Sequence, residues 1–206
     1  MSAITYKIRD SLYLNITNRC TNECTFCIRY ISKRFNGKHP LWLTKEPSEE
    51  ELLKEIIDPK QFDEIVFCGY GEPLIRIDLV KSLSKKLIAA RGSSKKPQIR
   101  VDTNGHANLF HQRNILPELK GLIDEIQISL NAENAKKYAE ICRPIYGEKS
   151  YQAILDFARE AKKYIPNVIL SVVDLTQIDK EACRLIATQL DVGFRIRPYY
   201  EEQYKK

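Results

Sequence analysis

Cys20, Cys24 and Cys27 are separated by three and then by two residues, directly after a short apolar segment. At this spacing their sulfur atoms can converge on one metal centre at the end of a strand. Thiolates are soft ligands that suit iron–sulfur clusters and zinc. A [4Fe–4S] cluster held by only three cysteines keeps one iron without a protein ligand, and such an open position is what chemistry requires. The spacing therefore predicts a metal centre, with a catalytic iron–sulfur cluster as the leading interpretation.

The alternative interpretation of the three cysteines is a structural zinc site completed by His39. Such zinc sites usually consist of two close pairs of ligands. His39 lies in a stretch without a second pair. With zinc, the chain would be a non-catalytic nucleic-acid-binding module rather than an enzyme.

Length and composition bound the organisation of the chain. Its 206 residues, 43% of them hydrophobic, can form one sizeable core, so we expect a single domain over residues 1–206. A net charge of +6 permits an anionic substrate. We find no secretory leader and no apolar stretch long enough for a membrane span, so we expect neither export nor membrane insertion. Cys68, Cys142 and Cys183 stand alone among apolar neighbours and are predicted to be buried thiols in a reducing, cytoplasmic compartment.

The apolar pattern predicts six strands that alternate with helices. The strands are expected at Leu12–Thr17, Glu64–Cys68, Gln98–Asp102, Asp124–Leu130, Asn167–Leu175 and Phe194–Tyr199. The helices are expected after a capping box at Ser48, after a cap at Asp78, at Asn114–Lys120, near Glu133–Cys142, at Ser150–Tyr164 and at Asp179–Leu190. Strict alternation favours a parallel sheet, and six units fall short of the eight in a closed barrel. We therefore expect an α/β fold, an open (β/α)6 partial TIM barrel.

Segments with chemically useful residues follow four of these strands. They are the cysteine loop at residues 18–29, Gly69–Pro73, Thr103–His106 and Ser129–Asn131. Loops at the carboxyl ends of parallel strands form the active face of such folds. The sequence therefore predicts that all four meet at one site.

The segment Gly69-Tyr70-Gly71-Glu72-Pro73 resembles the Gly-Gly-Glu-Pro motif of radical S-adenosylmethionine (SAM) enzymes, with Tyr70 where the first of the paired glycines is usual. The three cysteines, with aromatic Phe26 directly before Cys27, resemble the cluster loop of the same superfamily. The resemblance implies a [4Fe–4S] cluster and SAM as cofactors. It also implies reductive cleavage of SAM to a 5′-deoxyadenosyl radical, which abstracts hydrogen from an unknown substrate, and an external electron donor of the flavodoxin or ferredoxin type.

The resemblance further implies which residues contact SAM. They are the motif residues Gly69, Tyr70, Gly71, Glu72 and Pro73, the polar residues Thr103, Asn104, Ser129 and Asn131, and Phe26. The Glu72 carboxylate and nearby carbonyls can accept hydrogen bonds from an ammonium group, and hydroxyl and amide side chains suit ribose hydroxyls. The alternatives stay open. The motif can be an ordinary turn, Asn131 can cap the next helix, and Phe26 can be a core ring.

A finer resemblance is to the small radical SAM proteins associated with TatD-type hydrolases. It is carried by Tyr13–Cys20, Gly69–Pro73, Asn131–Glu133 with Ile141–Pro144, and Phe194–Arg197. It implies a functional link to a TatD-type hydrolase. A glycyl-radical activase and a deazapurine-type synthase are alternative enzyme functions that a chain of this size also allows.

Residues 28–47 form a long basic segment interleaved with aromatic residues. Arginines and aromatic rings together favour phosphates and bases, so Arg29 and Arg34 are candidate substrate contacts in a loop that closes over the cluster. Arg143, Arg195 and Arg197 are further candidates near late strand ends, and alternation places the last two on the same side of the sheet. The alternative is a solvated surface loop that Trp42 and Leu43 anchor to the core.

Overall fold

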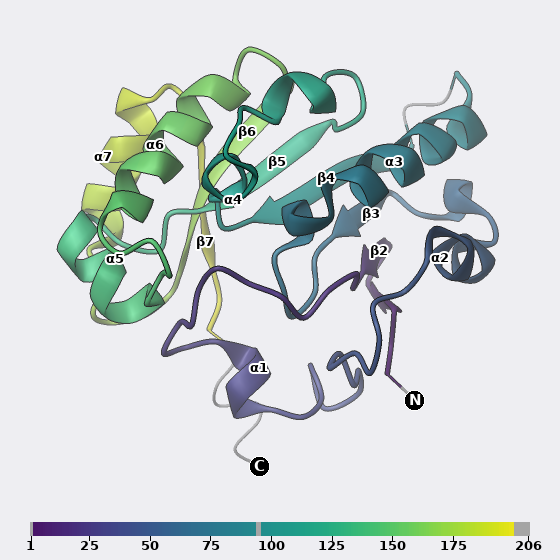
Figure 1. Ribbon diagram of the computed structural model, residues 1–206, viewed down its shortest axis with the longest axis horizontal. Helices are drawn as coiled ribbons and strands as arrows, with labels where there is room; N and C mark the ends of the chain where they lie inside the picture. The colour runs from purple at the N-terminus through teal and green to yellow at the C-terminus, as the bar shows by residue number, and fades with distance from the viewer. Residues whose placement is uncertain (1, 94–95, 200–206) are drawn as a thin grey trace.

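The computed structural model describes residues 2–93 and 96–199. Within them, seven strands form one sheet in sequence order, β1-β2-β3-β4-β5-β6-β7 (Figure 1). The strands are β1 (Thr5–Ile8), β2 (Ser11–Leu14), β3 (Glu64–Phe67), β4 (Gln98–Thr103), β5 (Glu125–Ser129), β6 (Asn167–Val173) and β7 (Gly193–Arg197). All neighbours from β2 to β7 pair in parallel, which confirms the expected open partial barrel. Residues 1, 94–95 and 200–206 of the predicted single domain lie outside the described part.

Strand β1 was not predicted. It forms an antiparallel hairpin with β2, in which Thr5 pairs with Leu14 and Ile8 with Ser11. Arg9 takes a left-handed conformation with φ of 52° at the turn. A glycine or asparagine is the usual signal for such a turn, and neither is present between the two strands. The missing turn signal and the four-residue length explain why the sequence pattern did not reveal β1.

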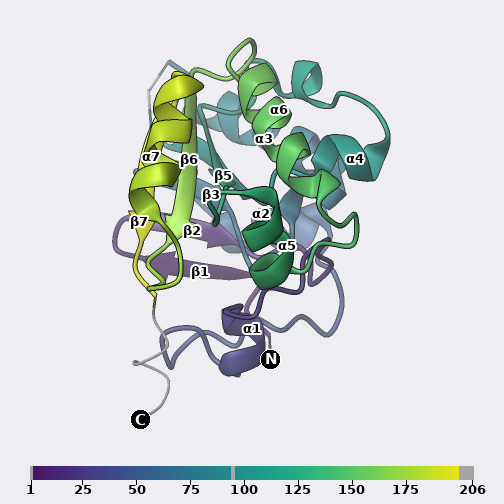
Figure 2. The same cartoon turned by 90° about the vertical axis from the view of Figure 1, so that its left-hand side faces the viewer.

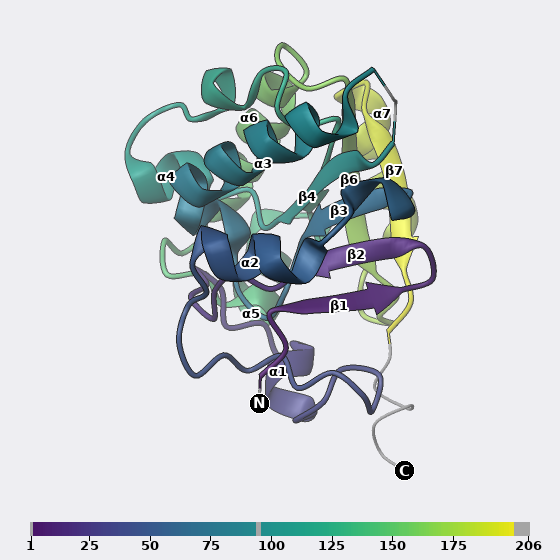
Figure 3. The ribbon, with the colours of Figure 1, turned by 90° about the vertical axis from the view of Figure 1, so that its right-hand side faces the viewer.

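The helices connect the strands and lie mostly on one face. Figures 2 and 3 show α2 to α6 on one side of the curved sheet, whereas α1 lies at its lower end. The α-helices are α1 (Ile28–Ile31), α2 (Glu49–Ile56), α3 (Ile77–Arg91), α4 (Ala107–His111), α5 (Ala135–Cys142), α6 (Lys149–Ala161) and α7 (Lys180–Gln189). Short 3-10 helices occupy η1 (Pro59–Gln61), η2 (Pro73–Arg76) and η3 (Leu116–Leu119). No described helix is long and apolar enough to cross a membrane.

Two helix ends agree with what the sequence predicts, and three features differ from the prediction. The capping box at Ser48 forms with Glu51, and the Asp179 side chain caps α7. Asp78 is not a cap, because α3 begins one residue earlier and Asp78 pairs with Lys81. The helix expected at Asn114–Lys120 is the shorter 3-10 helix η3. Asn134, not Asn131, caps α5, since its side chain accepts the Lys137 N–H.

The two faces of the sheet differ in chemistry. Alternate residues such as Ile65, Phe67 and Val101 are completely buried in the core that includes the helices. Burial of such apolar surface contributes about 25 cal/mol per Å² to stability. The opposite, inner face carries polar side chains in matching rows, because Asp102 pairs in register with Gln127, and Ser129 with Ser171. The partial barrel therefore has a polar interior that ends at the carboxyl edge of the strands.

Candidate functional site

The cysteine loop is held in place by the end of α5. The Glu23 N–H donates to the carbonyl of Cys142 at 3.1 Å, and the Thr25 N–H donates to Ile141 at 2.8 Å. In the other direction, the Ile145 N–H donates to the Thr21 carbonyl at 3.0 Å. These bonds form a short antiparallel bridge between residues distant in sequence. They fix the backbone between Cys20 and Cys27.

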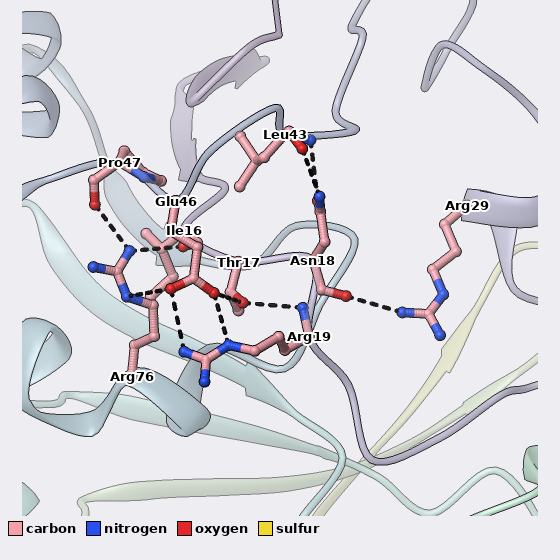
Figure 4. A network of polar contacts seen from close by, with 9 residues as sticks. All are labelled: Ile16, Thr17, Asn18, Arg19, Arg29, Leu43, Glu46, Pro47 and Arg76. Atoms are coloured by element: carbon pink, nitrogen blue, oxygen red, sulfur yellow. Dashed lines mark hydrogen bonds and ion pairs between the residues drawn. The ribbon is translucent and has the colours of Figure 1, made fainter.

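Arg29 holds the same loop from the other side. Its guanidinium donates to the carbonyl oxygens of Asn18 at 3.2 Å and Asn22 at 3.1 Å, and Figure 4 shows it reaching Asn18. The Asn18 amide in turn exchanges two hydrogen bonds with the backbone of Leu43. The guanidinium of Arg29 is thus bound to the cysteine loop, and its contact with a substrate stays a prediction.

An ion-pair network lies where the cysteine loop leaves β2. The Glu46 carboxylate accepts hydrogen bonds from the side chains of Thr17 at 2.5 Å and Arg19 at 2.8 Å, and Arg76 lies 3.4 Å away (Figure 4). These cations and the hydroxyl lower the pKa of Glu46, although its partial burial opposes them. The network joins residues 17–19 to the segment that precedes α2.

A buried polar network underlies Cys20. The Asn104 side-chain amide donates to Thr21 Oγ1 at 2.8 Å and lies 3.7 Å from Cys20 Sγ. Thr21 Oγ1 lies 3.0 Å from Nδ1 of His106, whose Nε2 lies 3.2 Å from the Tyr138 hydroxyl. Burial lowers the pKa of His106 to about 4, so its ring is neutral at neutral pH. In this structure the Asn104 amide binds the cysteine loop, and its predicted contact with SAM stays a prediction.

The glycine motif packs directly on the start of the cysteine loop. A Cβ atom on Gly71 would lie 2.4 Å from the Thr17 carbonyl oxygen and 2.6 Å from that of Arg19. The Glu72 N–H donates to the same Arg19 oxygen at 2.8 Å. Only glycine allows this approach, so the motif and the cysteine loop are built as one unit.

The Glu72 carboxylate is enclosed by the chain itself. Oε1 accepts from the Thr103 hydroxyl at 2.7 Å and the Leu74 N–H at 3.0 Å, and Oε2 accepts from the Asn104 N–H at 2.6 Å. Burial raises the pKa of Glu72 to about 7, although these three donors act in the opposite direction. Glu72 thus ties the motif to the end of β4. Both oxygens of the carboxylate already have hydrogen-bond partners in the chain. This agrees with the alternative interpretation, in which the motif is an ordinary turn.

Three other predicted residues serve the scaffold. Tyr70 is buried with Tyr6 and Leu41, and its hydroxyl donates to the Ser32 carbonyl at 3.0 Å. Pro73 begins the 3-10 helix η2 behind the motif and is also buried. Phe26 is partly buried against the main core, which agrees with the alternative interpretation of Phe26 as a core ring.

The carboxyl ends of β5 and β7 bring Ser129, Asn131 and Arg197 together. One guanidinium nitrogen of Arg197 donates to Ser129 Oγ at 3.2 Å and to Asn131 Oδ1 at 3.1 Å. Arg195 donates to Gln127 Oε1 at 3.2 Å, so both arginines lie over the inner face, as alternation predicted. Neither forms an ion pair within the described residues. Burial lowers the pKa of Arg197, which the carboxylate of Asp102 opposes.

Asp102, Cys68 and Arg100, which were not predicted as site residues, lie on the same inner face. Arg100 is 5% exposed, and its guanidinium lies within 3.3 Å of Glu64 and 3.1 Å of Asp102. Burial raises the pKa of Asp102, and Arg100 acts against this. The available signal was the alternation of Arg100 and Asp102 with Ile99 and Val101, which marks a strand with a polar inner face.

Two other predicted arginines have exposed side chains. Arg143 follows α5 in a left-handed conformation, with φ of 44° and an exposed side chain, so substrate contact by Arg143 stays a prediction. Arg34 is exposed on the basic segment. The cleft of about 780 Å³ between α6 and α7 opens at the opposite, amino edge of the sheet, and no predicted site residue lines it.

The residues at the cysteine loop fit a [4Fe–4S] cluster. All three thiols are free and partly exposed, so all three are available as ligands. The buried Oδ1 atom of Asn22 has no hydrogen-bond partner among the described residues, which leaves a polar atom for a bound group. Because a cube attaches each thiolate to a different iron, it does not require the three sulfurs to meet at one point.

The single-ion zinc site receives no such support. Within the described residues, no three side chains of Cys, His, Asp or Glu are grouped to hold one metal ion. His39 instead packs its ring 5.4 Å from that of Tyr6.

Comparisons with known proteins agree with the fold and show the family. Residues 14–187 match the family model described as "Radical SAM superfamily". A GTP 3′,8-cyclase of Lactiplantibacillus plantarum is 24% identical over 170 residues, which cover 81% of this chain and 46% of that protein. Two solved structures share the fold. HydG, a maturase of the [FeFe]-hydrogenase, has a TM-score of 0.59 at 18% identity, over 92% of this chain and 42% of its own.

The second structure, anSMEcpe with bound AdoMet, has a TM-score of 0.63 at 13% identity, over 91% of this chain and 50% of its own. The chain thus spans about half the length of the proteins it matches. The match to the family model covers most of the chain and includes the cysteine loop and the glycine motif. The chain therefore belongs to the radical SAM superfamily, whose enzymes use a [4Fe–4S] cluster and S-adenosylmethionine.

Proposed function

We propose that this chain holds a [4Fe–4S] cluster on Cys20, Cys24 and Cys27 and cleaves S-adenosylmethionine reductively to abstract hydrogen from a substrate in the partial barrel. When bound, the two cofactors supply a 5′-deoxyadenosyl radical. The observation that carries the proposal is the cysteine loop, fixed at the carboxyl edge of the sheet by α5, by Arg29 and by the glycine motif.

The cofactor side of the site is the edge formed by β3, β4 and β5. Backbone groups around Gly69–Gly71, with the side chains of Ser129 and Asn131, are the proposed contacts of S-adenosylmethionine. Glu72 orients this edge, because it accepts hydrogen bonds from both Thr103 and Asn104. Glu72, Thr103 and Asn104 already have hydrogen-bond partners, and Phe26 packs against the core. Each of these side chains would have to give up such a contact in order to touch the cofactor directly.

The substrate side is the polar inner face, and we propose an anionic substrate. Arg195 and Arg197 form hydrogen bonds only with neutral partners among the described residues, namely Gln127, Ser129 and Asn131. Guanidinium groups in such surroundings favour a carboxylate or phosphate. The similarity to a protein named GTP 3′,8-cyclase fits an anionic substrate class.

The finer assignment remains part of the proposal. The motifs at Tyr13–Cys20 and Phe194–Arg197 support a place among the TatD-associated proteins and a functional link to a TatD-type hydrolase. The six free cysteines support a reducing, cytoplasmic setting. Enzymes of this superfamily generally need an electron donor as well as a substrate, and a flavodoxin- or ferredoxin-type donor is proposed here.

The test is anaerobic iron and sulfide analysis, followed by incubation with dithionite and S-adenosylmethionine. We expect about four irons and four sulfides per chain and release of 5′-deoxyadenosine. Cys24→Ala should lose both, whereas Cys183→Ala, which removes a completely buried thiol of α7, should keep both. One zinc per chain, or a reconstituted cluster without 5′-deoxyadenosine, would refute the proposed function.

A further inference from the structure

The segment that follows the cysteine loop has an unusual charge pattern. From Ile28 to Lys45 it contains no acidic residue but five cationic ones, Arg29, Lys33, Arg34, Lys38 and Lys45. Two of these cations are occupied, since Arg29 binds loop carbonyls and Lys45 pairs with Glu51. The side chains of Lys33, Arg34 and Lys38 are exposed and form no ion pair within residues 2–93 and 96–199.

This segment is tethered to the sheet. Leu41 and Leu43 are buried, the Asn15 side chain donates to the Leu41 carbonyl at 2.7 Å, and the Ala3 N–H donates to Pro40 at 2.8 Å. Trp42, predicted as an anchor, is instead 53% exposed. A fixed backbone that presents cations to solvent has the character of a docking surface more than that of a closing loop.

Two large aromatic side chains share the segment with the free cations. Tyr30 is 58% exposed and Trp42 is 53% exposed. Exposed aromatic residues near arginine are enriched at the centres of protein interfaces. We use the name basic face for the exposed side chains of this segment, Lys33, Arg34 and Lys38 with Tyr30 and Trp42.

The basic face lies beside the cysteine loop. Helix α1 begins at the residue after Cys27, and Figure 1 shows α1 next to the end of that loop. Little negative charge lies nearby along the chain. Glu23 is the only acidic residue between Leu14 and Lys45, and Glu46 is already occupied by Thr17, Arg19 and Arg76.

We propose that the basic face docks a small acidic protein that carries single electrons. This rests on the proposed function, which requires one electron from outside the chain. In the transfer, the reduced carrier loses one electron and the cluster bound by the cysteines gains it, with no bond made or broken. Opposite charges steer such partners together and align them, while a modest interface allows rapid release after transfer.

The test measures binding by calorimetry under anaerobic conditions, with the cluster-loaded chain and a recombinant acidic flavodoxin as the probe. The variant is Lys33→Glu with Lys38→Glu, which spares Arg34 because Arg34 is also a candidate substrate contact. The matched control is Lys60→Glu with Lys120→Glu. Both lysines are exposed; Lys60 lies in η1, which precedes β3, and Lys120 follows η3, which precedes β5 at the amino edge of the sheet. Both variants change the net charge equally and should keep the iron content and circular dichroism of the native chain.

We expect the basic-face variant to weaken the Kd by about ten-fold or more at low salt, and the control by about two-fold or less. The difference should shrink at high ionic strength, because screening acts on exposed charges. An unchanged Kd, or equal weakening in both variants, would overturn the docking proposal. Dithionite reduces the cluster without the carrier protein. If dithionite failed to release 5′-deoxyadenosine from the native chain, this result would refute the proposed function, independently of the docking proposal.

Discussion

The side-chain amide of Asn104 lies 3.7 Å from the sulfur of Cys20. The same nitrogen donates to Thr21 Oγ1 at 2.8 Å, while Oδ1 accepts the His106 N–H at 3.0 Å. Asn104 therefore connects the carboxyl end of β4 to the first cysteine. Hydrogen bonds to cluster sulfurs are among the factors that set the reduction potential of an iron–sulfur centre.

Replacement of Asn104 by leucine should make the midpoint potential of the cluster more negative. The N–H donor stabilises the more negatively charged, reduced state, and leucine cannot replace it. The measurement is a redox titration followed by electron paramagnetic resonance. Thr21→Val is the matched control, because it loosens the same network and leaves the amide beside Cys20. Equal potentials in native chain and Asn104→Leu would show that Asn104 only supports the loop.

Cys142 provides the sharpest test of the ligand set. Its thiol is completely buried and hydrogen-bonds to Cys24, and this contact together with burial raises the pKa of Cys24. We expect Cys142→Ala to retain about four irons per chain, whereas Ala at Cys20, Cys24 or Cys27 should abolish the cluster. Iron and sulfide analysis after anaerobic reconstitution measures this. Loss of iron in Cys142→Ala alone, with Cys183→Ala as control, would identify Cys142 as a fourth ligand and contradict an open iron.

The sequence predicted much of this site because its signals are local. Cysteine spacing, the Gly71–Pro73 turn and the strand–helix alternation each depend on short segments, and β2 to β7 followed the prediction. The network of Asn104, Thr21 and His106 could not be predicted in the same way. It joins residues up to 85 positions apart, and only the folded sheet brings them together.

The direction of side chains in loops was the second feature that the sequence could not predict. Arg29 and Arg143 had the right type for an anionic substrate, but Arg29 turns toward the carbonyls of Asn18 and Asn22. The Arg143 side chain is exposed, and α5 ends at this residue in a left-handed turn. Alternation along a strand gave the correct side for Arg195 and Arg197, since strand geometry fixes direction and loop geometry does not.

Glu72 should make the stability of the chain depend on pH. Its carboxyl has a pKa of about 7 in the folded chain, raised by burial above the ordinary 4.5. The folded state therefore holds a proton that the unfolded state has lost between about pH 5 and pH 7, so stability falls as pH rises through this range. The effect amounts to roughly 3 kcal/mol at most.

Urea unfolding of the native chain and Glu72→Gln at pH 5.5 and pH 8 measures this contribution. The free energy of unfolding of the native chain should decrease relative to that of the variant as pH rises. Glu51→Gln is a suitable control, because Glu51 is a cap at the start of α2 and contributes no such raised pKa. If the free energies of unfolding of the native chain and of Glu72→Gln changed in parallel with pH, the titrating group would be a residue other than Glu72.

Gly71→Ala should separate the two loops that form the site. The added methyl group would overlap the carbonyl oxygens of Thr17 and Arg19, which are backbone atoms held by their own contacts and unable to yield as a flexible side chain can. We expect a loss of about 2 kcal/mol in stability and incomplete cluster incorporation, measured by urea unfolding and iron analysis. Gly193→Ala is the matched control, because its methyl group would meet the Ile169 side chain at 3.1 Å, which can shift. If Gly71→Ala loaded iron as fully as Gly193→Ala, close contact between the glycine motif and the cysteine loop would not be required to form the cluster site.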